Sequence, residues 1–113
     1  MKNNHYVQFL NLLKAIEAKD ICPDIDATCK QVLNEIALGM AEGNRLTVSD
    51  VMSLKTIGSP ATLHRKLNQL ITVNLVEAAF EGSNRRTKYM KLTPQGVAYF
   101  RRLSQAMQTA VQG

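Results

Sequence analysis

The sequence predicts a mainly α-helical fold with one small β-hairpin. Four stretches repeat apolar residues at helical spacing, two prolines follow good N-cap residues, and two short strand-like segments bracket a Gly-Ser-Asn turn. The chain has 113 residues, of which 45% are hydrophobic and 20% are charged. Because this length and composition allow a modest core, we expect a single domain spanning residues 1–113.

Two helices are expected in the N-terminal part of the chain. The first occupies about residues 3–20 and ends before a Cys-Pro pair, which cannot continue a helix. The residues that repeat along one face of this helix are Tyr6, Phe9, Leu10, Leu13 and Ile16. The second helix begins near Asp24 or Asp26, since either can act as its N-cap. It carries an apolar stripe over residues 29–40 and ends at a Gly-Asn pair.

Two further helices, joined by a short turn, are expected at residues 47–73. A short helix at about 48–55 follows Thr47 and Asp50, which have the spacing of a capping box. Ser59 then caps a longer helix, and the proline after it takes the first helical position, where its missing N–H costs nothing. The residues expected on the buried face of this helix are Leu63, Leu67, Leu70 and Ile71. Asn74 ends the helix because it tolerates the left-handed conformation.

A hairpin and a last helix complete the chain. The segments "LVEAAFE" and "RTKYMKL" read as two strands of a hairpin at residues 75–92, and Thr93-Pro94 begins a helix at 93–111. The expected apolar face of that helix comprises Val97, Phe100, Leu103, Met107 and Val111, with Tyr99 and Ala110 beside it. A helix-turn-helix followed by a charged hairpin is a winged helix-turn-helix, here with flanking N- and C-terminal helices.

Several classes of function are not expected. The sequence offers no nucleophile, base and orienting acid that could be assembled, and no Gly-rich phosphate loop, so we do not expect an enzyme. The two cysteines are seven positions apart and the two histidines are scattered, so we expect no metal or other cofactor. Cys29 reads as a buried thiol, whereas Cys22 is either silent or redox-sensitive.

The expected location is the cytoplasm. No stretch approaches the roughly 18–20 uncharged apolar residues of a membrane span, so no membrane partner is expected. The N-terminal segment carries polar and charged residues and does not resemble a secretory signal.

The charge is unevenly distributed along the chain. The net charge is +5. Residues 1–51 carry five basic and seven acidic side chains, a net charge of −2, whereas residues 52–113 carry nine basic and two acidic side chains, a net charge of +7. A polyanionic partner would therefore meet the C-terminal half. The alternative is that the basic half is only a solubilising surface.

The outward face of the helix at 59–73 has the composition of a surface that reads DNA bases. Its centre is Arg65, which lies roughly opposite the leucine stripe. Arginine can bond guanine, glutamine can pair with adenine, and alanine or a threonine methyl can pack on thymine. Lys66 lies at the edge, where it suits either a phosphate or the scaffold, and the N–H groups near Ser59 offer a further phosphate site. The helix residues expected at DNA are Ser59, Ala61, Thr62, Arg65, Lys66 and Gln69.

Three cations lie at or near the tip of the expected hairpin. Because neighbouring side chains diverge at a turn, Arg85 and Arg86 can have different roles. We expect Arg85 to enter a minor groove, Arg86 to brace the turn, and Lys88 to contact phosphate. The alternative is an idle, solvated hairpin.

From Leu46 to Gly96 the sequence resembles the DNA-binding core of MarR-type transcriptional regulators. The matching pieces are "LTVSDVM", "SPATLHRKLNQL", "NLVEA" and "NRRTKYMKLTPQG". The wing of that family commonly reads Asp-x-Arg followed by Leu-Thr-x-x-Gly. Here Asn84 replaces the acid, which removes an ion pair with Arg86, and Asn74 stands where the family usually has glycine.

The resemblance implies a sequence-specific regulator that binds double-stranded DNA, with the recognition helix in the major groove and a wing arginine in the minor groove. It also implies a homodimer held by the terminal helices, although their apolar stripes could instead cover the monomer's own core. A small-molecule effector is left open, since two terminal helices leave little room for a large pocket. The alternative function is a winged helix used for protein–protein contact, or in phage or plasmid replication, without sequence-specific DNA binding.

Overall fold

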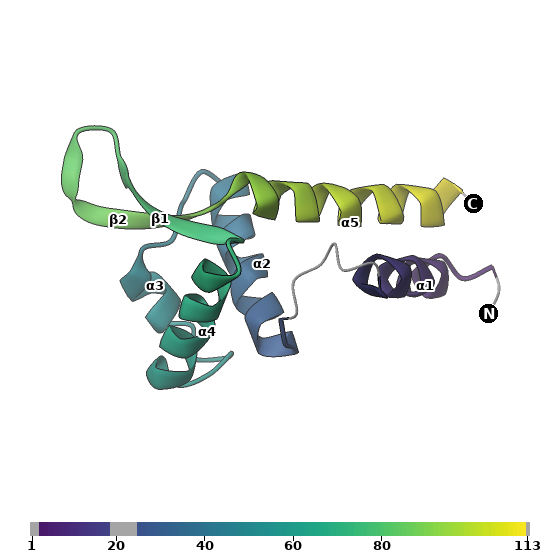
Figure 1. The fold of residues 1–113 in the computed structure, drawn as a ribbon, viewed down its shortest axis with the longest axis horizontal. Helices are drawn as coiled ribbons and strands as arrows, with labels where there is room; N and C mark the ends of the chain where they lie inside the picture. The colour runs from purple at the N-terminus through teal and green to yellow at the C-terminus, as the bar shows by residue number, and fades with distance from the viewer. Residues whose placement is uncertain (1–2, 19–24, 113) are drawn as a thin grey trace. The chain divides into compact units, whose positions relative to one another are not determined.

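The computed structural model describes residues 3–18 and 25–112. In chain order, the elements are α1 (His5–Ala18), α2 (Ala27–Ala41), α3 (Val48–Met52), α4 (Pro60–Thr72), β1 (Val76–Glu81), β2 (Asn84–Leu92) and α5 (Pro94–Gln112) (Figure 1). The predicted fold class, mainly α-helical with a hairpin wing, is confirmed. The helix predicted at about 48–55 is shorter than expected, because after Met52 the chain continues in i→i+3 turns.

The chain divides into two compact units. The winged-helix unit comprises Ile25–Gly96 and contains α2, α3, α4 and the hairpin. The terminal unit comprises Met1–Asp24 and Val97–Gly113 and contains α1 and most of α5. The division reflects contacts within each unit. The expected organisation as one domain over residues 1–113 stays a prediction.

The winged-helix unit has one apolar core to which every one of its elements contributes. The residues that are almost fully buried in it are Cys29, Val32, Leu33, Ile36, Val51, Leu63, Leu67, Leu70, Leu75, Val76 and Met90. The expectation that Ile71 is also buried was wrong, since this side chain is 42% exposed. Ile71 lies roughly 75° around the helix from the centre of the leucine stripe, and it therefore falls at the edge of the buried face.

The predicted helix starts are confirmed by their hydrogen bonds. Thr47 and Asp50 form a reciprocal capping box, with the Thr47 Oγ1 accepting from the Asp50 N–H at 3.1 Å and the Asp50 Oδ2 accepting from the Thr47 N–H at 2.9 Å. Ser59 caps α4 and Asp26 caps α2. Asn74, which ends α4, has a φ of 62°, so its left-handed conformation is also confirmed.

The hairpin has a regular stem and an irregular tip. β1 and β2 pair antiparallel from Val76↔Leu92 to Phe80↔Lys88, and the next pair is Glu81↔Asn84. This shift in register leaves residues 85–87 of β2 without partners on β1. A two-residue turn with Gly82 at a φ of 59° closes the tip, which projects beyond α3 in Figure 1.

A third short segment joins the hairpin. Thr47 forms a bridge with Tyr89, and the Met90 N–H donates to the Leu46 carbonyl at 2.7 Å. The start of α3 is therefore fixed against the base of the wing.

The end of the hairpin is tied tightly to the start of α5. The hydroxyl of Thr93, which is almost fully buried, donates to the Asn74 carbonyl at 2.6 Å and accepts from the Gly96 N–H at 3.0 Å. The Thr93 N–H in turn donates to the Leu75 carbonyl at 3.1 Å. A Cβ atom at Gly96 would overlap the Leu75 carbonyl oxygen. The Leu-Thr-x-x-Gly pattern therefore reflects a junction in which only glycine fits.

In the terminal unit, the buried face of α5 lies beside the predicted apolar face. Tyr99, Ala106 and Ala110 are buried, whereas Met107 and Val111 of the predicted apolar face are exposed. Leu12 of α1 lines one groove together with Ala106 and a second groove together with Ala110. The helix thus has two apolar faces, and the side with the small alanines is the covered one. The α1 helix likewise leaves apolar side chains exposed, among them Tyr6 and Leu10.

Candidate nucleic-acid interface

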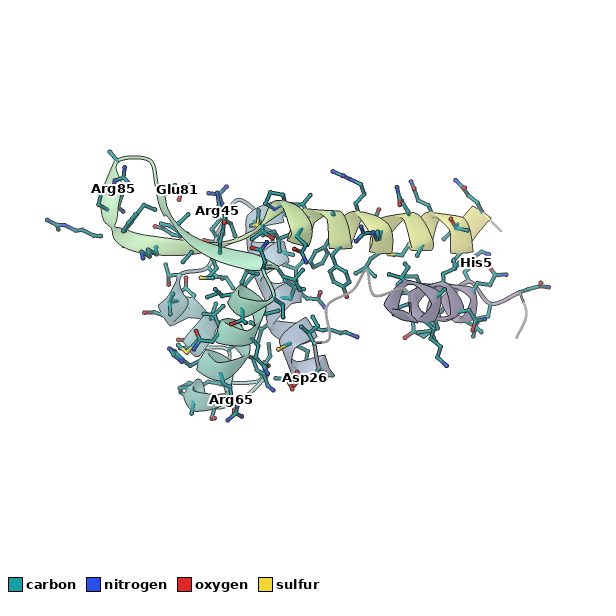
Figure 2. The ribbon with its side chains drawn as sticks, in the orientation of Figure 1. His5, Asp26, Arg45, Arg65, Glu81 and Arg85 are labelled. Carbon is teal, nitrogen blue, oxygen red and sulfur yellow. The ribbon has the colours of Figure 1, made fainter. Side chains whose placement is uncertain are left out.

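The outward face of α4 presents the side chains that the sequence placed there. Ala61 and Arg65 are exposed and lie about one helical turn apart, and Thr62 is half-buried. Ser59 uses its hydroxyl as the N-cap, accepting from the Thr62 N–H at 3.2 Å. Figure 2 labels Arg65 on this helix. The first turn of α4 therefore presents backbone that is capped by Ser59, with the unpaired guanidinium of Arg65 close by.

Lys66 faces the scaffold. Its Nζ lies 2.6 Å from the Oδ2 of Asp26, and its side chain is only 14% exposed. Of the two roles that the sequence left open for Lys66, the scaffold role is the one with a contact in the structure. The Lys66 ammonium, followed by the Cys29 backbone N–H, holds the pKa of Asp26 below its ordinary value.

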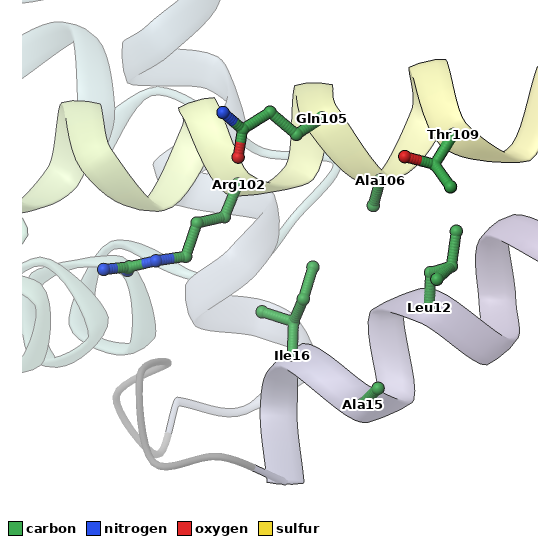
Figure 3. Close-up of a pocket in the computed structure, with 7 residues that line it drawn as sticks. All are labelled: Leu12, Ala15, Ile16, Arg102, Gln105, Ala106 and Thr109. Atoms are coloured by element: carbon green, nitrogen blue, oxygen red, sulfur yellow. The ribbon is translucent and has the colours of Figure 1, made fainter.

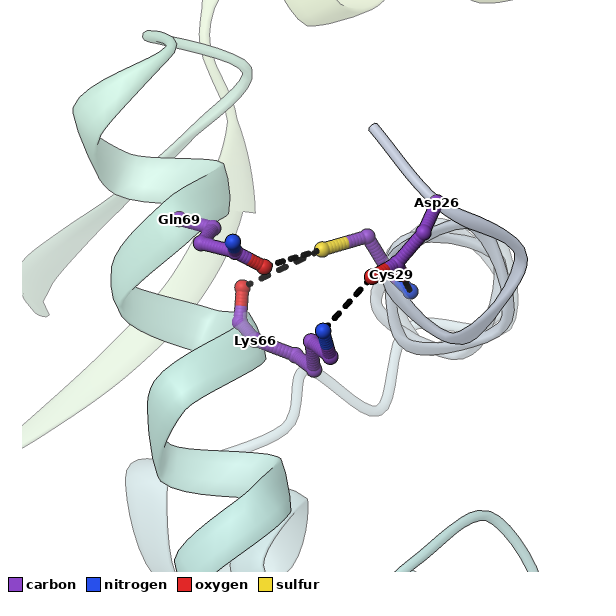
Figure 4. A network of polar contacts seen from close by, with 4 residues as sticks. All are labelled: Asp26, Cys29, Lys66 and Gln69. Atoms are coloured by element: carbon purple, nitrogen blue, oxygen red, sulfur yellow. Dashed lines mark hydrogen bonds and ion pairs between the residues drawn. The ribbon is translucent and has the colours of Figure 1, made fainter. Parts of the chain in front are cut away.

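Gln69 is also attached to α2. Its Oε1 accepts from the Cys29 thiol at 3.1 Å (Figure 4). Burial, and then the nearby charge of Asp26, raises the pKa of the Cys29 thiol above its ordinary value. These contacts connect α2, through Asp26 and Cys29, to α4, through Lys66 and Gln69. No local pattern indicated these contacts, because their partners lie 40 residues apart in the chain.

Two cations near the hairpin tip lie over one aromatic ring. The Arg85 guanidinium carbon lies 5.5 Å, and the Lys88 ammonium 5.4 Å, from the centroid of the Phe80 ring. The backbone N–H of Arg86 donates to the Asn84 Oδ1 at 2.9 Å. Asn84 therefore braces the turn through the backbone of Arg86, a contact that needs a side-chain oxygen but no negative charge.

The charges on these surfaces are uncompensated. In the winged-helix unit, Glu81 forms an ion pair with Arg45 at 3.7 Å, Asp26 with Lys66 at 2.6 Å and Glu77 with Lys91 at 3.4 Å. Among the residues that the structure describes, no ion pair involves the outward cations of α4 and the hairpin tip, which are Arg65, Arg85, Arg86 and Lys88. Figure 2 labels Arg85 and Glu81 on the hairpin, and the ion pair of Glu81 is with Arg45. An anionic partner could therefore meet all four charges.

Two other kinds of site find no support in the described part of the chain. Within residues 3–18 and 25–112, no three His, Cys, Asp or Glu side chains lie together as metal ligands. None of the helices described here is both long and apolar enough to cross a membrane. Cys22, for which a redox role was left open, lies outside the described residues.

The terminal unit contains a small groove between α1 and α5 (Figure 3). Its volume is about 270 Å³, and its lining residues are Leu12, Ala15, Ile16, Arg102, Gln105, Ala106 and Thr109. Pockets that hold drug-sized ligands usually measure roughly 300–1,000 Å³. This groove lies just below that range, and the expectation about an effector stays a prediction.

The architecture of the chain is that of a known class of solved structures. No protein-family model matches the sequence, and no curated protein matches it significantly. The structure of Staphylococcus aureus MepR bound to ethidium bromide is similar, with a TM-score of 0.68 and 17% identity over 90% of this chain and 71% of that one. A variant of S. aureus MepR bound to an oligodeoxyribonucleotide gives a TM-score of 0.66 and 16% identity, over 95% and 72% of the two chains.

MarR from E. coli, in its apo form, is similar as well. Its TM-score is 0.59, with 21% identity over 95% of this chain and 73% of that one. At such identities the likeness concerns the fold. The chain has the winged helix-turn-helix fold of MarR-type regulators, as the segment from Leu46 to Gly96 predicted.

Proposed function

We propose that this chain is a sequence-specific, double-stranded DNA-binding regulator of transcription in the cytoplasm, and not an enzyme. The observation that carries the proposal is the set of four unpaired cations on α4 and the hairpin tip, described above among the residues of the winged-helix unit. Phosphate contacts from such cations supply most of the non-specific affinity of DNA-binding proteins. The fold adds support, since a MepR variant with the same architecture is bound to an oligodeoxyribonucleotide.

In this proposal α4 is the recognition helix and lies in a major groove. Arg65 is exposed and unpaired, so it is the residue best suited to bond guanine. The methyl of Ala61 and the side chain of Thr62 lie near the helix start, where they can pack on a base edge. Lys66 and Gln69 contribute mainly by holding α4 against α2, because both are engaged by residues of α2.

The hairpin is the wing in this proposal. Three consecutive residues of β2 have no partners on β1, so the chain bulges outward where Arg85 and Arg86 lie. Arg85 is assigned to a minor groove and Lys88 to phosphate, as the sequence led us to expect. Arg86 was expected to brace the turn; since the side chain of Asn84 already does so through the Arg86 backbone N–H, we assign the Arg86 side chain to phosphate instead. Ser59 completes the surface by fixing the first-turn N–H groups of α4, which can meet a phosphate.

The proposed regulator acts as a homodimer. Exposed large apolar side chains occur on both helices of the terminal unit, at Tyr6 and Leu10 of α1 and at Val97, Met107 and Val111 of α5. Apolar surface of this kind commonly marks an interface, and a second copy of the chain would cover it. Light scattering tests the dimer directly, since Met107→Glu should shift the protein to a monomer.

Selection from a pool of random duplexes tests the proposed function. We expect an inverted-repeat motif, because a symmetric dimer places two recognition helices on two half-sites. Arg65→Ala should relax the preference at one base position by about 1–3 kcal/mol. Arg85→Ala should weaken binding. If no motif emerges and affinity barely depends on salt, the protein-contact or replication alternative is favoured instead.

A further inference from the structure

Phe80 has an unusual position for a large apolar side chain. It is 37% exposed, and it is the last residue of β1 in the regular part of the ladder, directly opposite Lys88. The register of the hairpin shifts immediately after it. The ring therefore lies at the base of the bulged tip, where the regular stem of the hairpin ends.

Both neighbouring cations contact this ring. The Arg85 guanidinium carbon and the Lys88 ammonium lie 5.5 Å and 5.4 Å from the ring centroid. A cation within about 6 Å of an aromatic centroid is attracted to the face of the ring. A single side chain thus restricts the positions of two long, flexible cations.

The ring restricts these cations without neutralising them. Glu81, the nearest residue with a carboxylate along β1, forms its ion pair with Arg45 at 3.7 Å. A carboxylate beside Arg85 would orient the guanidinium but would also cancel its charge. An aromatic ring orients the guanidinium and leaves the full charge available to a phosphate.

We propose that Phe80 is a positioning residue of the DNA-binding surface. It holds Arg85 and Lys88 near their binding positions before DNA arrives, so that less side-chain freedom is lost on binding. This inference rests on the proposed function, since it concerns how the wing cations meet DNA.

Substitutions at Phe80 distinguish an effect of the aromatic ring from an effect of side-chain size. Phe80→Leu keeps an apolar side chain on the strand but removes the ring, and we expect binding to a selected duplex to weaken about two- to fivefold. Phe80→Tyr keeps the ring and should bind like wild type. Leu38→Ala, which removes an exposed apolar side chain from α2, is the matched control and should leave affinity unchanged.

Two further readouts distinguish positioning from a general structural role. The salt dependence of binding should keep its slope in Phe80→Leu, because no phosphate contact is removed. In the Arg85→Ala/Lys88→Ala background, Phe80→Leu should have no additional effect. In the free protein, the side-chain proton NMR signals of Arg85 and Lys88 should lose their ring-current shifts in Phe80→Leu.

The outcomes separate this inference from the proposed function. If wild type binds duplex DNA and Phe80→Leu binds equally well, the positioning role is wrong and the proposed function stands. The positioning role is also wrong if Phe80→Leu weakens binding equally with and without the two cations. If wild type binds no duplex at all, the proposed function fails and the inference fails with it.

Discussion

Asp26 and Lys66 form an ion pair of 2.6 Å between the start of α2 and the middle of α4. The same carboxylate has a second partner, because its Oδ1 accepts from the Cys29 N–H at 2.8 Å and so caps α2. One side chain therefore begins one helix and holds another. The orientation of the proposed recognition helix depends on how α2 starts.

Substitutions at Asp26 should separate these two functions. Asp26→Asn keeps a capping oxygen but loses the charge, whereas Asp26→Ala loses both. At neutral pH we expect wild type to be the most stable and Asp26→Ala the least stable in urea unfolding.

The effect of the Asp26 charge should depend on pH. The pKa of Asp26 is lowered in the folded protein, so its contribution is complete above the ordinary value of 3.8 and is lost as the pH falls through the folded-state pKa. The gap between wild type and Asp26→Asn should therefore shrink in acid. A gap of constant size from neutral pH to well below 3.8 would contradict the ion pair.

Gly96 should tolerate no larger residue. A Cβ at this position meets the backbone carbonyl of Leu75, which is fixed by the hydrogen bond from Thr93 and cannot easily move. We expect Gly96→Ala to lower the free energy of unfolding by about 1–3 kcal/mol. Gly58→Ala is the control, since its Cβ would meet only the Thr62 side chain, at 3.2 Å. Equal losses for the two variants would argue against the tight junction.

The thiol of Cys29 should react slowly with disulfide reagents in the folded protein. Burial raises its pKa, so little thiolate is present at neutral pH, and the neutral form is the one favoured by folding. We expect a Cys22→Ser variant to react slowly with a disulfide reagent until it is unfolded. Because the pKa of Cys29 is higher in the folded than in the unfolded protein, the protonated thiol contributes to stability below the ordinary pKa of 9.0. This contribution is lost as the pH rises through the pKa of the folded protein. Rapid labelling of the folded variant would show that the thiol is accessible.

The helix starts of this fold could be predicted because their signals are local. Thr47 with Asp50, and Ser59 with its proline, act within a few residues of sequence, and their hydrogen bonds are present in the structure. The left-handed Asn74 is likewise a property of one residue. Such capping signals identified both helices of the helix-turn-helix and the end of the second.

The supports of the candidate site could not be predicted in the same way. The contact of Lys66 with Asp26 joins residues 40 positions apart, and no spacing rule connects them. The shifted register beside Phe80 depends on how two strands pair, which composition does not reveal. Periodicity identified an apolar face on α5, but it does not show which of two neighbouring apolar faces another helix will cover, and Met107 and Val111 of the predicted face are exposed.

The most direct test of the proposed surface is the salt dependence of affinity for a selected duplex. We would compare wild type with Arg86→Ala and Lys88→Ala, and use Lys91→Ala as the control because Glu77 already pairs with that lysine at 3.4 Å. The logarithmic slope should become shallower by about 0.9 for each phosphate contact removed, and it should change little in the control. A wild-type affinity that is independent of salt, or equal slopes in all four proteins, would contradict a DNA-binding surface built from these unpaired cations.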